Sequence, residues 1–158
     1  MIQKTAEHLK SVDPVLERLT ERIGPVSVKA RRVPVLQSLV QTIIYQQLHS
    51  KAADSILNRF EVLFGDGHFR SADQVLAMQP EQPRSASLSR PKANYVRDIA
   101  EKAASGAQPT LKECDKMTDA EIVQRLTGMK GVGRWTVVWS SKRYGKRPDT
   151  PNQFRSGH

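Results

Sequence analysis

Residues 126–136 read Leu-Thr-Gly-Met-Lys-Gly-Val-Gly-Arg-Trp-Thr, and this stretch decides the fold of the chain. It follows a helix whose start is marked by the capping box Thr-Asp-Ala-Glu at residues 118–121. Gly131 and Gly133 bracket a turn, and we expect a second helix to begin at about Arg134. The stretch therefore predicts two helices joined by a short hairpin.

The glycines of this hairpin favour close approach of a phosphate group. Because they lack Cβ atoms, Gly131 and Gly133 let the backbone approach a phosphate and adopt positive φ angles. The N-terminus of the second helix would add N–H groups and the positive end of its dipole. An ordinary turn ended by C-cap glycines is the alternative. The predicted phosphate-binding residues are Lys130, Gly131, Val132, Gly133, Arg134 and Thr136.

The charge of the chain favours an anionic partner. Its formal net charge is +9 and its isoelectric point is about 10.0, which points to nucleic acid, although a solubilising surface is the plainer alternative. No run of 18 apolar residues is present, so we expect no membrane span. The first eight residues also lack the apolar core of a secretory signal.

The single cysteine, Cys114, excludes an internal disulfide and a four-cysteine metal site. The histidines outside the motifs, His8, His68 and His158, show no spacing typical of a metal site. We therefore expect no cofactor held by side chains. A reduced, cytoplasmic or nucleoid-associated location fits this composition, or a nuclear one in a eukaryote.

Apolar residues recur at helical spacing along most of the chain, and no convincing β-alternation is present. We therefore predict an all-α fold. Asp13 and Pro14 are typical of a helix start, and Ser71 to Gln74 form a further capping box. Helices are predicted near residues 14–23, 36–44, 53–64 and 92–104, with a loop at 80–83.

Three motifs in this order resemble the helix-hairpin-helix DNA glycosylases, in particular the DNA-3-methyladenine glycosylase II group. The first is the hairpin at 126–136. The second is Ile-Ile-Tyr-Gln-Gln-Leu-His-Ser-Lys-Ala-Ala at 43–53, and the third is Leu-Ser-Arg-Pro-Lys-Ala-Asn-Tyr at 88–95. The resemblance covers roughly residues 12–139. One departure is Ser87, where the family usually has glycine.

The resemblance implies a two-lobed helical fold and base excision from double-stranded DNA. Bifunctional members place a catalytic lysine where this chain has Trp135, which cannot form a Schiff base, so a monofunctional lineage is implied. Trp135 would line the base pocket and stack on a cationic alkylated purine, or it simply packs the hairpin against the body. Tyr45 is a second pocket candidate and is equally compatible with the core.

The resemblance also places a wedge after Gln46 and Gln47, where His49 or Leu48 would fill the gap left by a flipped base. The alternative is an exposed histidine at a helix start. A monovalent cation held by the carbonyls of Thr127, Met129 and Val132 is implied by the resemblance alone.

The carboxylate that such chemistry requires is missing from its expected place. Breaking a glycosidic bond builds positive charge on the sugar, which an aspartate about twenty residues beyond the hairpin tryptophan stabilises in the family. That count falls on Arg155. Asp149 is the one carboxylate after Glu121, and it fits the segment before the catalytic loop better, so it is a weak candidate. We expect slow release of alkylated bases or none, which leaves a DNA-binding module without catalysis as an alternative.

The last residues change in character. Apolar residues become rare after Trp139, so we divide the chain into a glycosylase-like domain at 1–139 and a basic tail at 140–158. A frame or terminus altered near 138–140, or a natural disordered tail, would explain this change. The expected fold is then incomplete at its C-terminus, and a truncated product without function is a further alternative. We expect a monomer unless exposed core surface drives association.

Overall fold

The computed structural model describes residues 2–24, 32–65, 67, 69 and 71–144, and within these ranges it contains helices and turns but no strand. The all-α prediction is confirmed. None of these helices has the length and apolar character needed to cross a membrane. The helices are α1 (Ile2–Val12), α2 (Pro14–Ile23), α3 (Val35–Tyr45), α4 (Ser50–Val62), α5 (Ala72–Leu76), α6 (Gln82–Ser85), α7 (Arg90–Ala104), α8 (Leu111–Lys116), α9 (Asp119–Thr127) and α10 (Arg134–Tyr144).

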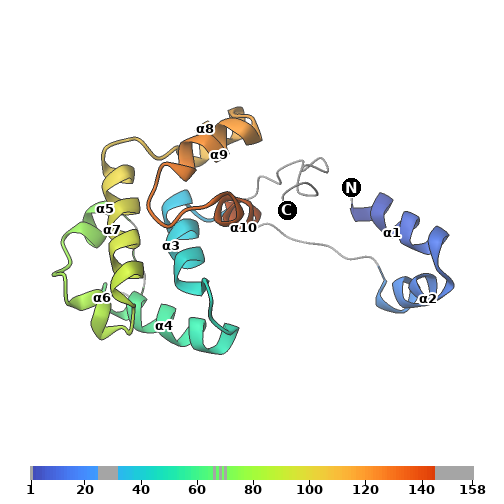
Figure 1. Cartoon of the computed structure of the whole chain (residues 1–158), viewed down its shortest axis with the longest axis horizontal. Coiled ribbons are helices and arrows are strands. Elements are labelled where there is room, and N and C mark those ends of the chain that lie inside the picture. Colours follow the sequence, from blue (N-terminus) through green and yellow to red (C-terminus); the bar gives the residue numbers. More distant parts are fainter. Residues whose placement is uncertain (1, 25–31, 66, 68, 70, 145–158) are drawn as a thin grey trace.

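Helix α3 is central to the body formed by α3–α10. It packs against α4, α7 and α10, as can be followed in Figure 1. Each large aliphatic side chain that it buries is worth about 1.5–3 kcal/mol, so this helix contributes much of the core. Its buried residues are Val35, Leu36, Ser38, Leu39, Val40, Ile43 and Ile44.

Small serines form part of the contact between α3 and α10. Ser38 and Ser140 are completely buried, and the Ser38 hydroxyl donates to the Ser140 carbonyl at 2.9 Å. The Ser140 hydroxyl donates to the Val137 carbonyl at 2.9 Å, so both hydroxyls are satisfied. The domain boundary placed after residue 139 therefore falls inside α10, which continues to Tyr144. Buried serines take the place of the apolar residues expected there.

The predicted helix starts are mostly present. Asp13 caps α2 through hydrogen bonds from the Val15 and Leu16 amides, and α10 begins at Arg134 as expected. Three helices were not predicted, α1, α6 and α8, although Thr110 and Glu113 form a capping box that signals α8. The loop expected at 80–83 is also only partly correct, because α6 begins at Gln82.

Helices α1 and α2 pack against each other and lie apart from the other helices (Figure 1). Neighbouring apolar side chains on this pair remain exposed. Such a surface is suited to self-association, and the monomeric state remains a prediction. The exposed residues are Leu9, Val12, Val15, Leu19 and Ile23.

Ser87 adopts a left-handed backbone conformation, with φ of 69°, which explains why glycine is usual at this place in the resembling family. A non-glycine residue there costs about 1–2 kcal/mol, whereas glycine loses about 0.5–1 kcal/mol in chain entropy. We expect Ser87→Gly to raise the free energy of unfolding by about 0.5–1 kcal/mol in urea titrations. Ser105→Gly is the control, because Ser105 has an ordinary φ of −76°. Equal stabilisation by both changes would contradict this explanation.

Candidate nucleic-acid interface

The hairpin between α9 and α10 is shaped by Gly131. Its φ is 77°, in the region that favours glycine. A Cβ atom at this position would lie 2.6 Å from Cγ of Tyr95, so the aromatic ring leaves no room for a side chain. Tyr95 belongs to the motif at 88–95. The positive φ was among the sequence expectations, whereas the contact with Tyr95 adds a packing reason for the glycine that the sequence did not indicate.

Gly133 is open where Gly131 is enclosed. Nothing in the described part of the chain lies within 4 Å of a Cβ placed on Gly133. Across the same ranges, the backbone N–H groups of Gly131 and Gly133 make no hydrogen bond. Gly133 immediately precedes α10, whose N-terminus carries the positive end of the helix dipole. These amides are therefore available to an external acceptor such as a phosphate oxygen.

Gln46 joins the end of α3 to the hairpin. Its side-chain Nε2 donates to the Gly131 carbonyl at 3.2 Å and to the Thr136 hydroxyl at 3.0 Å. Thr136 and Val132 are buried, so their side chains support the hairpin from the protein side. The phosphate contacts predicted for these two residues remain a prediction that involves backbone atoms alone, and the Val132 amide already donates to the Met129 carbonyl.

Lys92 joins the third motif to the second. Its Nζ donates to the carbonyls of Ile44 and Gln46 at 2.8 and 2.7 Å, which caps the C-terminal end of α3. Desolvation by burial lowers the pKa of Lys92 from its ordinary value. The three motifs that the sequence placed far apart thus meet in one contact network.

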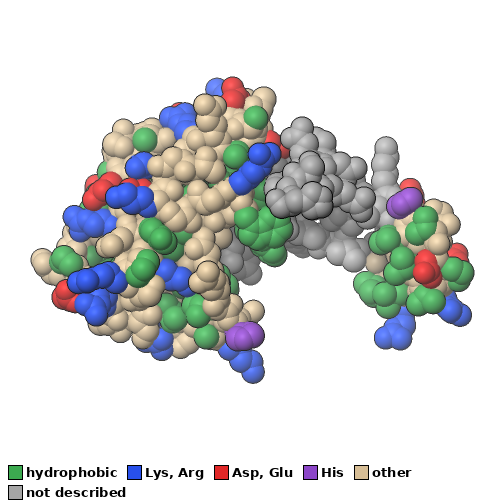
Figure 2. Space-filling view, viewed as in Figure 1, with side chains coloured by type: hydrophobic (Ala, Val, Ile, Leu, Met, Phe, Trp, Pro, Cys, Tyr) green, Lys and Arg blue, Asp and Glu red, His purple; other side chains and the backbone are tan. Residues whose placement is uncertain are grey.

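The aromatic residue proposed for base stacking is at the surface. Trp135 lies in the first turn of α10 and is 63% exposed, and its ring packs edge-on against Trp139 with centroids 6.2 Å apart. Figure 2 shows hydrophobic side chains gathered at the surface over α10. The exposed part of the ring is accessible to a base, and the role of Trp135 in the base pocket remains a prediction. Tyr45 is half-buried, and its hydroxyl donates to a carboxylate oxygen of Asp54.

Leu48 and His49 lie in the turn between α3 and α4 and are both exposed. His49 occupies the N-cap of α4 but makes no capping hydrogen bond with its side chain. An exposed histidine at a helix start was the alternative, and it is compatible with the same geometry. The wedge role of either residue remains a prediction.

The described residues contain no cluster of three or more histidine, cysteine or acidic side chains that could hold a metal. For the monovalent cation, the Met129 carbonyl already accepts the Val132 amide at 3.2 Å. A carbonyl oxygen has two lone pairs, so this bond leaves one for an ion. The cation at Thr127, Met129 and Val132 remains a prediction. Asp149 and Arg155 lie outside the described residues.

Several supporting residues were missed from the sequence. Gln46, Lys92 and Tyr95 stood inside the quoted motifs, yet no contact could be assigned to them before the helices were placed. Asp98 was missed altogether. It accepts a hydrogen bond from the Lys130 amide at 2.9 Å, and its spacing to Lys102 resembles an ordinary surface ion pair.

The three motifs lie within a stretch of the chain that matches a known protein family. A family model described as HhH-GPD superfamily base excision DNA repair protein matches residues 40–150. The chain belongs to this superfamily. The match includes all three motifs, and it continues past residue 139, where the resemblance seen in the sequence was expected to end. The helix-hairpin-helix glycosylase assignment and its base-excision-repair function are confirmed at the level of the superfamily.

Individual relatives agree. The chain is 32% identical to DNA-3-methyladenine glycosylase 1 of Schizosaccharomyces pombe over 164 residues, covering 99% of this chain and 72% of the relative. It is 27% identical to the alkylbase DNA glycosidase-like protein mag2 of the same yeast, covering 85% of this chain and 64% of that protein. None of these names supports the alternative of a binding module without catalysis.

Solved structures show the same fold. The 3-methyladenine DNA glycosylase of S. pombe in complex with abasic DNA superposes with a TM-score of 0.77 at 33% identity, covering 87% of this chain and 68% of that one. A DNA-3-methyladenine glycosidase from Bacillus halodurans superposes with a TM-score of 0.70 at 31% identity, covering 84% and 60%. Both solved proteins are longer than this chain, and each match covers only part of their length.

Proposed function

We propose that this superfamily member is a monofunctional N-glycosylase of the DNA-3-methyladenine glycosylase II group, which releases alkylated bases from double-stranded DNA. The observation that carries the proposal is the start of α10, where the open Gly133 and the exposed Trp135 stand two residues apart. In this proposal, one helix end would carry both a site for a DNA phosphate and a platform for a base. Work on the chromosome would place the protein in the nucleoid or nucleus.

The DNA backbone would be held without reading its sequence. The amides of Gly131 and Gly133 would donate to one phosphate, and the exposed side chains of Lys130 and Arg134 would add charge. Gln46 and Tyr95 keep the turn in place from the protein side. This division supports binding along any duplex until a damaged base is met.

The damaged base would be stacked on Trp135. An alkylated purine is cationic, and the electron-rich face of an indole attracts a cation by about 0.5–2 kcal/mol, depending on how far the site is desolvated. Tyr45 would border the same pocket, and Leu48 or His49 would fill the gap in the duplex. The cationic base is also a better leaving group, so flipping and stacking alone can give some release.

Lys130 and Arg134 should determine how binding responds to salt. We expect the unchanged chain to bind duplexes of unrelated sequence with similar affinity. This affinity should fall strongly as the salt concentration rises, because phosphate contacts release counterions. Lys130→Ala or Arg134→Ala should each lower the slope of log affinity against log salt by about one. Fluorescence anisotropy at several salt concentrations measures this. Arg84→Ala on α6 is the control and should leave the slope unchanged. Salt-independent binding by the unchanged chain would refute the hairpin interface.

The chemical part of the proposal is tested by release of 3-methyladenine from methylated duplex DNA under single-turnover conditions. We expect the unchanged chain to release the base slowly, yet faster than the DNA does alone. If the chain bound DNA but did not release the base faster than DNA does alone, the glycosylase proposal would be refuted, whereas the hairpin interface would still be supported.

A further inference from the structure

Asp98 is a buried carboxylate on α7 to which the proposed chemistry gives no role. The residue is 8% exposed, whereas its neighbour Glu101 on the same helix has a side chain that is 55% exposed. Burying a carboxylate is costly unless it is hydrogen-bonded and paired with positive charge. The partners of Asp98 therefore indicate what the carboxylate stabilises.

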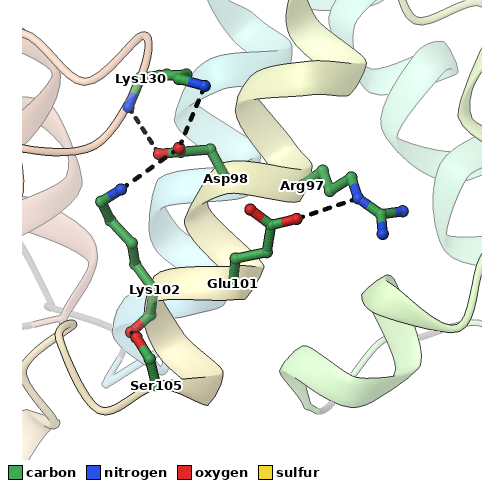
Figure 3. Close-up of polar contacts among 6 residues, drawn as sticks. All are labelled: Arg97, Asp98, Glu101, Lys102, Ser105 and Lys130. Carbon is green, nitrogen blue, oxygen red and sulfur yellow. Dashed lines mark hydrogen bonds and ion pairs between the residues drawn. The ribbon is translucent and has the colours of Figure 1, made fainter.

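One oxygen of Asp98 holds the backbone of the hairpin. Its Oδ2 accepts from the Lys130 amide at 2.9 Å, and Lys130 directly precedes Gly131 (Figure 3). A hydrogen bond between a backbone N–H and a carboxylate is among the stronger kinds in proteins. The amide of Lys130 is thereby directed at α7, and the amides of Gly131 and Gly133 are left for an external acceptor, while the Val132 amide donates to the Met129 carbonyl.

The other oxygen is shared between two lysines. Asp98 Oδ1 lies 3.4 Å from Nζ of Lys102 and 3.9 Å from Nζ of Lys130 (Figure 3). The Lys130 side chain is 75% exposed, so this longer pairing leaves it at the surface. Asp98 thus contacts both the backbone amide and the side-chain ammonium group of Lys130 in the hairpin.

We infer that Asp98 is a positioning residue for DNA binding, which fixes the turn at Lys130 so that the Gly131 and Gly133 amides face one phosphate. The inference rests on the proposed function. The positioning role and the charge of Asp98 predict opposite changes in DNA affinity when the carboxylate is removed. A carboxylate close to a DNA-binding hairpin repels phosphates, so its removal should strengthen binding if charge were its only effect. Loss of a positioning contact should weaken binding instead.

The test compares Asp98→Ala and Asp98→Asn in the whole chain by anisotropy binding to an abasic-site duplex across several salt concentrations. We expect Asp98→Ala to bind about tenfold more weakly, with a salt slope lower by about one, because one phosphate contact is lost. Asp98→Asn keeps an oxygen that can accept from the Lys130 amide, and it should recover most of the affinity. The matched control is Glu101→Gln, since Glu101 pairs with Arg97 at 3.2 Å and does not contact the hairpin in the described structure.

Amide hydrogen exchange supplies a readout that does not require DNA. The Lys130 N–H should exchange faster in Asp98→Ala and should stay protected in Glu101→Gln. Unchanged exchange, or affinity equal to or above that of the unchanged chain in Asp98→Ala, would overturn the inference. If the unchanged chain itself failed to bind DNA while the Lys130 exchange behaved as expected, the proposed function would fail and the hairpin contact would stand. Thermal melting of each variant confirms that folded protein is compared.

Discussion

Arg155→Asp should release alkylated bases about 100- to 1000-fold faster than the unchanged chain, because one well-placed electrostatic group is commonly worth about 2.7–4 kcal/mol in the transition state. Cleavage of the N-glycosidic bond builds positive charge on the sugar. A guanidinium at the acid position would repel that charge, and a carboxylate would stabilise it. The count from Trp135 along the sequence places this position at residue 155.

Asp149→Asn is the companion variant, since Asp149 lies inside the family match at 40–150 and Arg155 lies beyond it. We expect Asp149→Asn to change the rate little. Single-turnover release of 3-methyladenine from methylated duplex measures both variants. A large loss in Asp149→Asn, with no gain in Arg155→Asp, would show that Asp149 is the carboxylate and that the count from Trp135 was wrong.

Gly131→Ala should be the most destabilising single change in the hairpin. The left-handed φ of 77° costs an alanine about 1–2 kcal/mol, and the clash with the Tyr95 ring adds about 1–3 kcal/mol of overpacking. Together these approach the whole stability of a marginal domain, which is about 5 kcal/mol. Urea denaturation measures the loss, and DNA binding should fall with it.

Gly133→Ala is the matched control for this change, because a Cβ there meets nothing within 4 Å among the described residues. Its stability should change by less than about 1 kcal/mol. DNA affinity should nevertheless fall, since the added methyl group would stand where the phosphate is proposed to approach. The double variant Tyr95→Ala with Gly131→Ala should cost less than the sum of the two single changes, because the ring and the methyl group compete for one space. Strict additivity would show that Tyr95 does not enclose Gly131.

Local signals allowed much of the fold to be predicted. Asp13, Ser71 and Thr118 mark helix starts through side-chain contacts within three residues, and those contacts form as expected. The hairpin was also predictable, because its glycines and the helix that follows are neighbours in sequence. Helix α1 lacked such a signal, and the capping box at Thr110 that starts α8 was passed over.

The supporting contacts of the site depend on residues that are distant in sequence. The side chain of Gln46 reaches Gly131 across 85 residues, and Asp98 reaches the Lys130 amide across 32. A glutamine or an aspartate on a helix surface gives no sign of such a partner. The contact between Gly131 and Tyr95 could not be predicted for the same reason, because it exists only when α7 packs against the hairpin. Ser140 is a third case, since the loss of apolar residues after Trp139 indicated the start of a basic tail, whereas Ser140 is buried and its carbonyl accepts from the Ser38 hydroxyl.

The central claim, that the start of α10 releases alkylated bases by stacking them on Trp135, is tested most directly by single-turnover base release from methylated duplex DNA. The unchanged chain is compared with Trp135→Ala, Trp135→Phe and Trp139→Ala, since Trp139 is a second exposed tryptophan one turn along the same helix. We predict slow release of 3-methyladenine above the rate of DNA alone, lost in Trp135→Ala, largely kept in Trp135→Phe and reduced least in Trp139→Ala. Release that is no faster than from DNA alone, or that is unaffected by Trp135→Ala, would contradict the claim.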